Sequence, residues 1–379
     1  MKKSLFLLTT GIIVVFTACQ KHTTGFTVSA NLSGFSEKAK VIVANGNTGK
    51  VLDSTALVDN QFVATGLIEE PPVPITIQVS SENNETAYAV IYIGNEDVKV
   101  SGRKEDFPDA LEVTGSHYQK YKAELDKGIA PLNKKRSEKL QEMFSLRQEG
   151  KWNDSLQRAY WSKESGVITH IDDQISHITR SFIEDNINSD YALSQLVLNK
   201  ADFTKEFIER QLGRLNADYK NSASAKVLTT YLGSKPLENG DKFYDFTAEN
   251  QKGEHVPFAN SFKDKYVLLE FCSPYCSWCV KALPEIKELS KQESESLDIV
   301  TMNVDSNKED WLKKYTSNKI TWTSLYDKDG RYSDVYTKYR VFMTPTYYLF
   351  DKNGLVVGKW DGYSDSLLEE IKERLKHGN

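Results

Sequence analysis

The sequence predicts a multidomain α+β protein, with a β-sandwich-like domain first, a helical region in the middle and an α/β domain at the end. Three changes along the chain predict this organisation. Residues 26–113 contain short alternating runs, residues 114–232 adopt a helical period, and residues 233–379 return to strands that alternate with helices. A chain of 379 residues is also too long for one ordinary hydrophobic core.

The first domain, residues 26–113, has the pattern of a β-sandwich. Runs such as Phe26–Leu32 and Pro74–Val79 are apolar or alternating, and turn clusters such as Asn45–Gly49 separate them. No residue pattern in this domain indicates chemistry.

The middle region, residues 114–232, has helical periodicity. Ile168, Ile171 and Phe182 belong to a series of apolar residues spaced three and four apart, and charged residues fill the other faces. We therefore expect amphipathic helices that pack against other parts of the protein.

The last region, residues 233–379, follows the order β-α-β-α-β-β-α. Tyr266–Phe271 is an almost continuous apolar run, which is typical of a buried central strand. A helix is predicted over 277–292, and the turn at Asp351–Gly354 predicts a hairpin. We expect the remaining elements at 297–304 (strand), 308–317 (helix) and 365–376 (helix).

The N-terminus has the features of an export signal. Lys2 and Lys3 precede an apolar segment, and the segment ends in Val15–Cys19. This ending resembles a bacterial lipobox, which implies a signal peptide over residues 1–18, lipid on Cys19 and a tether over 19–25. No acidic run follows Cys19, so we expect a protein that is lipid-anchored in the bacterial cell envelope and faces the periplasm.

Three of the four cysteines, Cys272, Cys276 and Cys279, lie in one short stretch. If a helix begins near Cys276, unpaired backbone N–H groups and the helix dipole stabilise its thiolate. Cys279 lies one turn later on the same face, so a disulfide can close between the two. Cys276 is therefore predicted to attack and Cys279 to resolve. A zinc site would need two more ligands, and the sequence offers no fitting pair.

The segment Glu270–Pro284 resembles the active-site segment of thioredoxin-fold proteins, particularly the TlpA-like membrane-anchored thiol-disulfide oxidoreductases. The resemblance covers roughly residues 240–376 and makes the last domain thioredoxin-like. It implies that Cys276 and Cys279 are the catalytic pair and that Pro284 kinks the helix that follows.

Further positions follow from the same resemblance. Glu270 falls where thioredoxin keeps a buried acid that exchanges protons with the resolving thiol. Thr344-Pro345 matches the cis-proline loop, in which Pro345 packs on the disulfide and Thr344 offers backbone hydrogen bonds to the substrate chain. Tyr275 and Trp278, beside the pair, are assigned to substrate binding. The first domain resembles the β-domain that precedes thioredoxin modules in many envelope lipoproteins and has no established activity.

The chain departs from the family pattern at Cys272, where the family usually has tryptophan, and at Ala282, where many members have glutamate. Cys272 has two interpretations. The first, which we favour, is a small buried residue at the end of a strand. The second is a regulatory third thiol that captures Cys276 and switches the site off.

These observations predict an envelope thiol-disulfide oxidoreductase that acts as a reductase. Its expected partners are disulfide-containing envelope proteins, an upstream thiol electron donor and, through Cys19, the membrane; no cofactor or metal is expected. The net charge of −5 and the absence of a basic stripe argue against nucleic acid. Three alternatives remain open: a Cu(I) carrier that uses the Cys272–Cys276 spacing, a peroxidase of the peroxiredoxin class, and a binding lipoprotein without catalysis.

Overall fold

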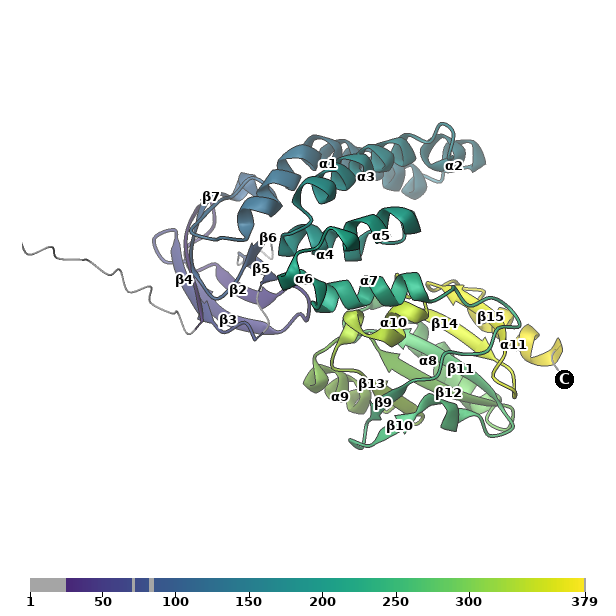
Figure 1. The fold of residues 1–379 in the computed structure, drawn as a ribbon. Helices are drawn as coiled ribbons and strands as arrows, with labels where there is room; N and C mark the ends of the chain where they lie inside the picture. The colour runs from purple at the N-terminus through teal and green to yellow at the C-terminus, as the bar shows by residue number, and fades with distance from the viewer. Residues whose placement is uncertain (1–24, 70–71, 82–84, 378–379) are drawn as a thin grey trace, which may run out of the picture.

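The computed structural model describes residues 25–69, 72–81 and 85–377, and it has three parts (Figure 1). A β-rich domain comes first, helices follow, and an α/β domain closes the chain, so the predicted fold class is confirmed. The predicted signal peptide and the lipidation site Cys19 lie outside the described residues. No helix in the described part of the chain is long and apolar enough to cross a membrane.

The N-terminal domain packs two four-stranded sheets face to face, in the orders β4-β1-β7-β8 and β3-β2-β5-β6. The hydrophobic core lies between the sheets, and the strands alternate accordingly: Val73, Ile75, Ile77 and Val79 are buried, whereas the residues between them are half-exposed. The strands are β1 Phe26–Ser33, β2 Lys40–Asn45, β3 Val51–Ala56, β4 Gln61–Gly66, β5 Val73–Ser80, β6 Thr86–Ile93, β7 Asp97–Arg103 and β8 Glu112–Thr114.

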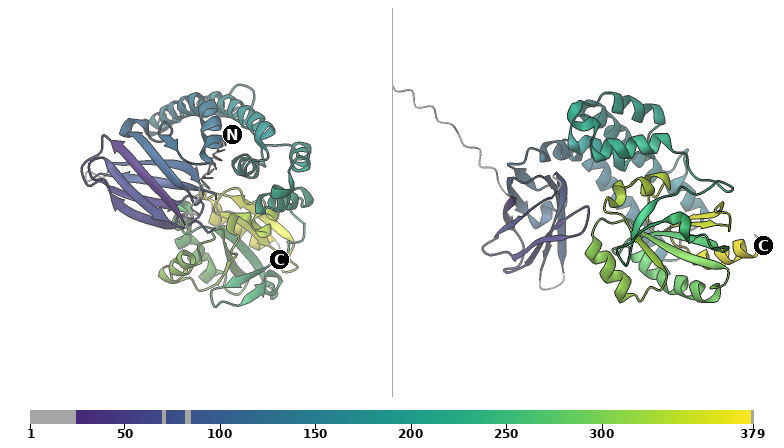
Figure 2. Two further views of the ribbon diagram at one scale, coloured as in Figure 1. Left: turned by 60° about the vertical axis from the view of Figure 1, so that its left-hand side comes forward. Right: turned by 60° about the horizontal axis from the view of Figure 1, so that its bottom comes forward.

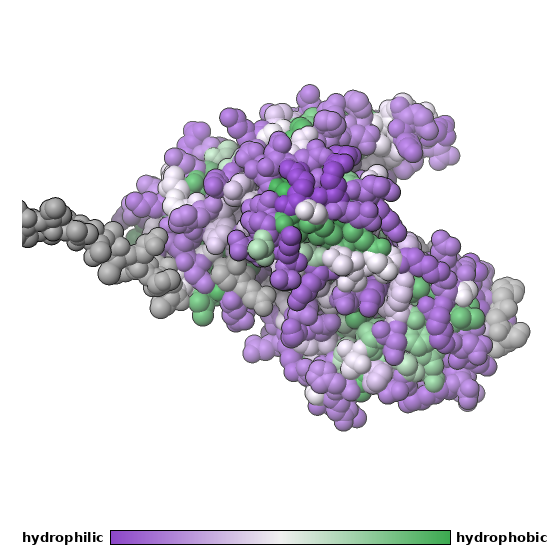
Figure 3. All heavy atoms as spheres, viewed as in Figure 1, coloured by the Kyte–Doolittle hydropathy of each residue, from purple (hydrophilic) through white to green (hydrophobic). Residues whose placement is uncertain are grey.

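The middle region is built from helices, of which the two longest, α1 and α3, run side by side (Figures 1 and 2). Ile168, Ile171 and Phe182 of the predicted apolar series are buried on α3. Polar side chains cover most of the face seen in Figure 3, and apolar ones show between them. The helices are α1 Gln119–Gln148, α2 Asp154–Trp161, α3 Val167–Asn186, α4 Asp190–Leu198, α5 Lys205–Gly213, α6 Ala217–Lys220 and α7 Ala223–Gly233.

The C-terminal domain has a seven-stranded sheet in the order β10-β9-β13-β12-β11-β14-β15. Strand β11 is central, pairs in parallel with β12 and antiparallel with β14, and is buried at six of its seven residues. The strands are β9 Thr247–Asn250, β10 His255–Pro257, β11 Tyr266–Cys272, β12 Leu297–Asn303, β13 Thr323–Tyr326, β14 Thr346–Phe350 and β15 Val356–Asp361. The helices are α8 Ser277–Gln292, α9 Lys308–Ser317, α10 Asp334–Lys338 and α11 Leu367–His377.

The order predicted for this domain omits four elements, β9, β10, β13 and α10. The three strands have only three or four residues each, and α10 has five. Periodicity needs a longer window, so their pairing in the sheet becomes visible only from the tertiary structure.

The three parts contact one another in a ring. The N-terminal domain meets the helices through Tyr92, whose ring lies 5.1 Å from that of Tyr191 on α4. The helices meet the C-terminal domain through Arg340, which is only 5% exposed. The N-terminal domain also meets the C-terminal domain directly, where Gly49 approaches Tyr275.

Arg340 carries the second of these contacts. One terminal nitrogen donates to the carbonyl oxygens of Tyr231 and Ser234 at 2.7 and 2.6 Å, and the other donates to the Thr337 carbonyl oxygen and the Ser234 hydroxyl. The guanidinium also lies 3.9 Å from the centre of the Tyr231 ring. Substitution would leave the carbonyl groups of α7 and of the residue after it without their donor.

We predict that Arg340→Met lowers the free energy of unfolding by about 3 kcal/mol, because hydrogen bonds from a charged donor to buried acceptors are lost. Arg340 has a positive φ of 50°, and methionine tolerates this conformation no better and no worse than arginine does. Denaturant unfolding checks the change. Lys352→Met, at an exposed position of the same domain, is the control, and equal effects of the two substitutions would contradict the prediction.

Candidate functional site

The cysteine stretch lies where the central strand β11 passes into helix α8. The strand ends at Cys272, the helix begins at Ser277, and Cys276 is the N-cap residue of α8. The structure thus places Cys276 at the helix start that the sequence predicts. The positive end of the helix dipole lies at its sulfur atom.

The Cys276 sulfur makes two hydrogen bonds. It accepts one from the Cys279 backbone N–H at 3.1 Å and donates one to the Thr344 carbonyl oxygen at 3.2 Å. Loss of the thiol proton ends the second bond and leaves the first, which a thiolate accepts more strongly. The residue is partly exposed, so a disulfide in solution can reach it.

Cys279 lies one turn further along α8 and is only 7% exposed. Burial raises the pKa of its thiol well above the usual range, and the neighbouring Cys276 and Glu270 add to the rise. The two cysteines of the pair are therefore not equivalent. The partly exposed one is suited to attack an incoming disulfide, and the buried one to resolve it.

The Thr344–Pro345 peptide bond is cis, as the family resemblance implies. Its loop is held by the Thr346 hydroxyl, which donates to the Met343 carbonyl oxygen at 2.9 Å, and by the Gly362 N–H, which donates to the Pro345 carbonyl oxygen at 2.8 Å. The loop therefore presents the Thr344 carbonyl group directly to Cys276.

Glu270 is a buried acid beneath the cysteine pair, with only 4% of its surface exposed. The Thr301 hydroxyl donates to one carboxylate oxygen and the Tyr347 hydroxyl to the other, both at 3.2 Å. Burial raises the pKa of Glu270 to about 7, although the two hydrogen bonds oppose the rise. A carboxyl group of this pKa can both accept and return a proton near neutral pH.

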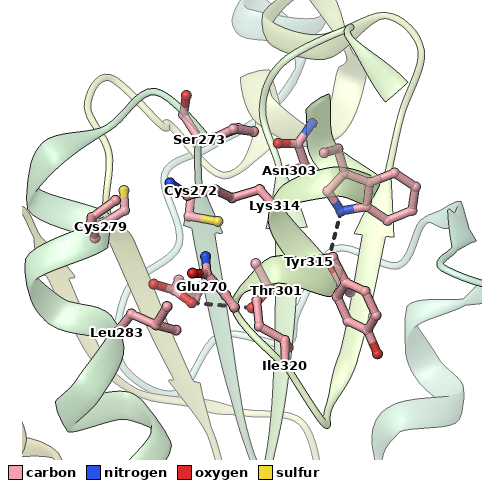
Figure 4. A pocket seen from close by; sticks show the side chains of 15 residues that line it. Glu270, Cys272, Ser273, Cys279, Leu283, Thr301, Asn303, Lys314, Tyr315 and Ile320 are labelled. Atoms are coloured by element: carbon pink, nitrogen blue, oxygen red, sulfur yellow. Dashed lines mark hydrogen bonds between the residues drawn. The ribbon is translucent and has the colours of Figure 1, made fainter. Parts of the chain in front are cut away.

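Figure 4 shows that Glu270, Cys272 and Cys279 line one small cavity, of about 50 Å³, between β11, α8 and the α9 side of the sheet. This volume has room for water molecules. The Glu270 carboxyl group and Cys279 therefore border the same small space.

Cys272 stands at the end of β11 as a partly exposed, unpaired residue. Burial of its thiol raises the pKa well above the usual range, and Glu270, Cys279 and Cys276 raise it further. A thiol of this kind is a poor nucleophile near neutral pH.

Tyr275 and Trp278 are both about half-exposed beside the cysteine pair. The Tyr275 hydroxyl donates to the Asp310 carboxylate on α9. The Trp278 ring stacks on Tyr363, with a centroid distance of 6.1 Å. Both aromatic rings are thus held at the surface around Cys276, in a position to meet a substrate.

The sequence alone does not predict several residues of the site. Thr301 and Tyr347 lie in strands that the sequence predicts, yet their contacts with Glu270 depend on the register of β12 and β14 against β11. Their polar atoms in otherwise apolar strands are the one available signal.

No group of three or more His, Cys, Asp or Glu side chains is placed to hold a metal ion within the described ranges. Cys272, Cys276 and Cys279 are all free cysteines in this structure.

Comparisons with known proteins agree with this geometry. Residues 239–359 match the AhpC/TSA family. Thiol-disulfide oxidoreductase ResA from Bacillus cereus is 26% identical over 162 residues, which are 41% of this chain and 88% of the relative. Thioredoxin-like protein YneN from Bacillus subtilis is 28% identical over 123 residues, which are 32% of this chain and 69% of the relative.

The family match covers most of the C-terminal domain and agrees with its thioredoxin-like fold. The predicted resemblance to TlpA-like thioredoxin-fold proteins and the predicted enzyme class, thiol-disulfide oxidoreductase, are both confirmed. The copper-carrier and non-catalytic alternatives are not favoured, and the peroxidase alternative stays a prediction. The solved thioredoxin domain of a thiol-disulfide oxidoreductase from Bacteroides vulgatus is 30% identical, covers 37% of this chain and 99% of its own, and has a TM-score of 0.33.

The first domain has a match of its own. Residues 26–121 match a domain of unknown function, DUF4369. The matched range includes all eight strands of the β-sandwich and the start of α1.

The raised pKa of Glu270 predicts a pH-dependent stability. Between about pH 4.5 and pH 7 the folded protein holds a proton on Glu270 that the unfolded chain releases, so stability falls as the pH rises through this window. Over the whole window the free energy of unfolding falls by roughly 3 kcal/mol. We expect Glu270→Gln to remove this dependence.

Unfolding free energies of the wild type and of Glu270→Gln, measured at several pH values between 4 and 8, check this expectation. The control is Glu288→Gln on the outer part of α8. A wild-type curve parallel to that of Glu270→Gln over the whole range would contradict it, as would a carboxyl resonance of Glu270 that titrates at the ordinary value.

Proposed function

We propose that this protein is an envelope thiol-disulfide oxidoreductase that exchanges a Cys276–Cys279 dithiol for a disulfide of a protein substrate, and that it acts as a reductase. The observation that carries the proposal is the Cys276 sulfur at the start of α8, with the Cys279 N–H on one side and the Thr344 carbonyl oxygen on the other. The relatives are named thiol-disulfide oxidoreductases, which supports the same reaction class.

The reaction has two exchange steps. The Cys276 thiolate attacks one sulfur of the substrate disulfide, and the other substrate sulfur leaves as a thiolate. Cys279 then loses its proton and attacks the Cys276 sulfur, which releases the second substrate sulfur and leaves a Cys276–Cys279 disulfide. A dithiol electron donor must reduce this disulfide before the next cycle.

We assign three supporting roles. Glu270 takes the proton of Cys279 in the second step, since it shares a cavity with that thiol and has a pKa of about 7. The Thr344 backbone and Pro345 contact the substrate chain. Tyr275 and Trp278 contact it with their exposed rings.

We further propose that Cys19 carries a lipid and anchors the protein in the bacterial cell envelope, facing the periplasm. The lipobox-like residues before Cys19 support this location. So does the chemistry, because disulfides form and persist in compartments outside the reducing cytosol. Its partners are then disulfide-containing envelope proteins and a thiol donor.

The proposal predicts that Cys276→Ser loses at least about tenfold of the rate at which the wild type catalyses reduction of a disulfide-linked unstructured peptide by dithiothreitol, because the attacking thiolate is gone. Chromatography of the released peptide thiols measures the rate. Cys19→Ser, outside the redox pair, is the control and should keep the wild-type rate. Equal rates for Cys276→Ser and the wild type would contradict an enzymatic role.

Replacing the resolving thiol separates the two steps. In Cys279→Ala the first attack still occurs, but nothing releases the mixed disulfide, so covalent complexes with envelope proteins should accumulate in cells. Non-reducing electrophoresis and mass spectrometry identify them. The double variant Cys276→Ala/Cys279→Ala is the control and should trap none; the same bands in both variants would mean that they form elsewhere.

For Cys272 we propose the structural role, a small residue at the strand end, over the role of a regulatory thiol. Its raised pKa makes it slow to compete with Cys276. Peptide mapping of the oxidised protein should therefore show a bond between Cys276 and Cys279 and a free Cys272. A bond between Cys272 and Cys276 would support the regulatory role instead.

A further inference from the structure

A cavity of about 320 Å³ lies between the N-terminal domain and the cysteine pair. On one side it is lined by residues 46–49, the turn between β2 and β3, which we call the hairpin turn. On the other side it is lined by residues of the thioredoxin-like domain: Ser273, Tyr275, Cys276, Asp305 and Thr344. Cys276 thus lines a cavity to which two domains contribute residues.

The hairpin turn is held in a defined shape. The Asn45 side-chain oxygen accepts the N–H groups of Asn47 and Thr48 at 2.9 and 3.3 Å. The Gly49 N–H donates to the Asn45 carbonyl oxygen at 2.8 Å, and the Gly46 N–H donates to the Pro74 carbonyl oxygen on β5 at 2.7 Å. The wall that this turn forms is therefore anchored in the β-sandwich.

The hairpin turn also touches the active-site loop. Gly49 has a φ of +69°, and a Cβ atom at this position would lie 3.2 Å from the Tyr275 ring. Only glycine fits both conditions without strain. The Tyr275 hydroxyl donates a hydrogen bond to Asp310 on α9, which fixes the position of the ring. The contact between Gly49 and this ring therefore places the turn directly beside Cys276.

The opposite wall is the cis-proline loop. Its residues Phe342 and Met343 are 48% and 51% exposed, and the Lys200 ammonium group of the helical region lies 5.6 Å from the centre of the Phe342 ring. Exposed apolar side chains therefore belong to the same loop as Thr344, which lines the polar cavity beside Cys276. Such a combination suits a polypeptide segment, which brings both backbone polar groups and side chains.

We propose that the hairpin turn is the specificity-determining wall of the site, and that it admits an extended, cysteine-bearing polypeptide segment while it excludes disulfides on the surface of a folded protein. The inference rests on the proposed exchange activity and adds the substrate class to it. The cavity has the size of sites that enclose a small ligand or a short segment. A rigid globular surface cannot reach Cys276, because the hairpin turn meets it first.

The test compares one disulfide in two contexts. A cysteine joined to glutathione by a disulfide is presented either in an unstructured nonapeptide or on an exposed helix of a globular protein. Second-order rate constants are measured for oxidation of the reduced full chain by each probe, and glutathione disulfide serves as a probe of the exchange chemistry itself. We expect the rate constant of the wild type with the peptide probe to exceed that with the folded probe by at least about a hundredfold.

Two variants move the wall in opposite directions. Deletion of residues 46–49 together with Lys50→Gly leaves a two-residue Asn–Gly hairpin, removes the wall and should raise the rate with the folded probe at least about tenfold. Asn47→Trp fills the cavity and should lower the rate with the peptide at least about tenfold. Asn353→Trp, in the exposed turn between β14 and β15, is the matched control and should change neither rate.

The outcomes separate the two proposals. Reaction of the wild type with glutathione disulfide, combined with a peptide-to-folded ratio that neither variant changes, would overturn the role of the hairpin turn and leave the exchange activity in place. No reaction of the wild type with any of the three probes would overturn the exchange activity and the inference with it. If the deletion prevents folding, Asn47→Trp decides alone, because it leaves the backbone contacts of the turn intact.

Discussion

The arrangement of the site depends on the hydrogen bonds that the buried guanidinium of Arg340 donates to backbone carbonyl groups. Arg340 lies directly before the loop 341–345 and binds carbonyl oxygens of Tyr231 and Ser234, at the end of the helical region. The loop that presents Thr344 to Cys276 is therefore fixed to the helices as well as to its own sheet. Since the helices are in turn packed on the β-sandwich, Arg340 links this loop, through the helices, to the N-terminal domain.

This coupling explains why so much chain surrounds so small a reaction centre. Exchange between thiols and disulfides needs little catalytic apparatus: one exposed sulfur at a helix start, one buried sulfur a turn later, and a carbonyl group opposite. A thioredoxin-like domain supplies all of these. The β-sandwich adds a wall beside the sulfur through residues 46–49, and in the role that we propose this wall changes which disulfides can arrive rather than how they react.

The sequence predicts the chemistry of the site better than its surroundings. The positions of Cys276 and Cys279 follow from spacing and helix entry, and Glu270 stands out as an acid in an apolar strand. The partners of Glu270 do not follow, because Thr301 and Tyr347 reach it through strand register. Nor does the place of Asn45–Gly49: its local residues determine a hairpin turn, but only the packing of whole domains brings that turn to Tyr275.

The cavity beneath the pair imposes a last constraint. Glu270, Cys272 and Cys279 line the same small space, and each negative charge placed there raises the pKa of the others. In the mechanism that we propose, Cys279 becomes a nucleophile most easily when Glu270 takes its proton, since the cluster then still carries one charge rather than two. Cys272 has no part in this proposed transfer, and the raised pKa of its thiol makes it a slow nucleophile near neutral pH. On this proposal a third thiol can lie beside the pair without competing for the disulfide.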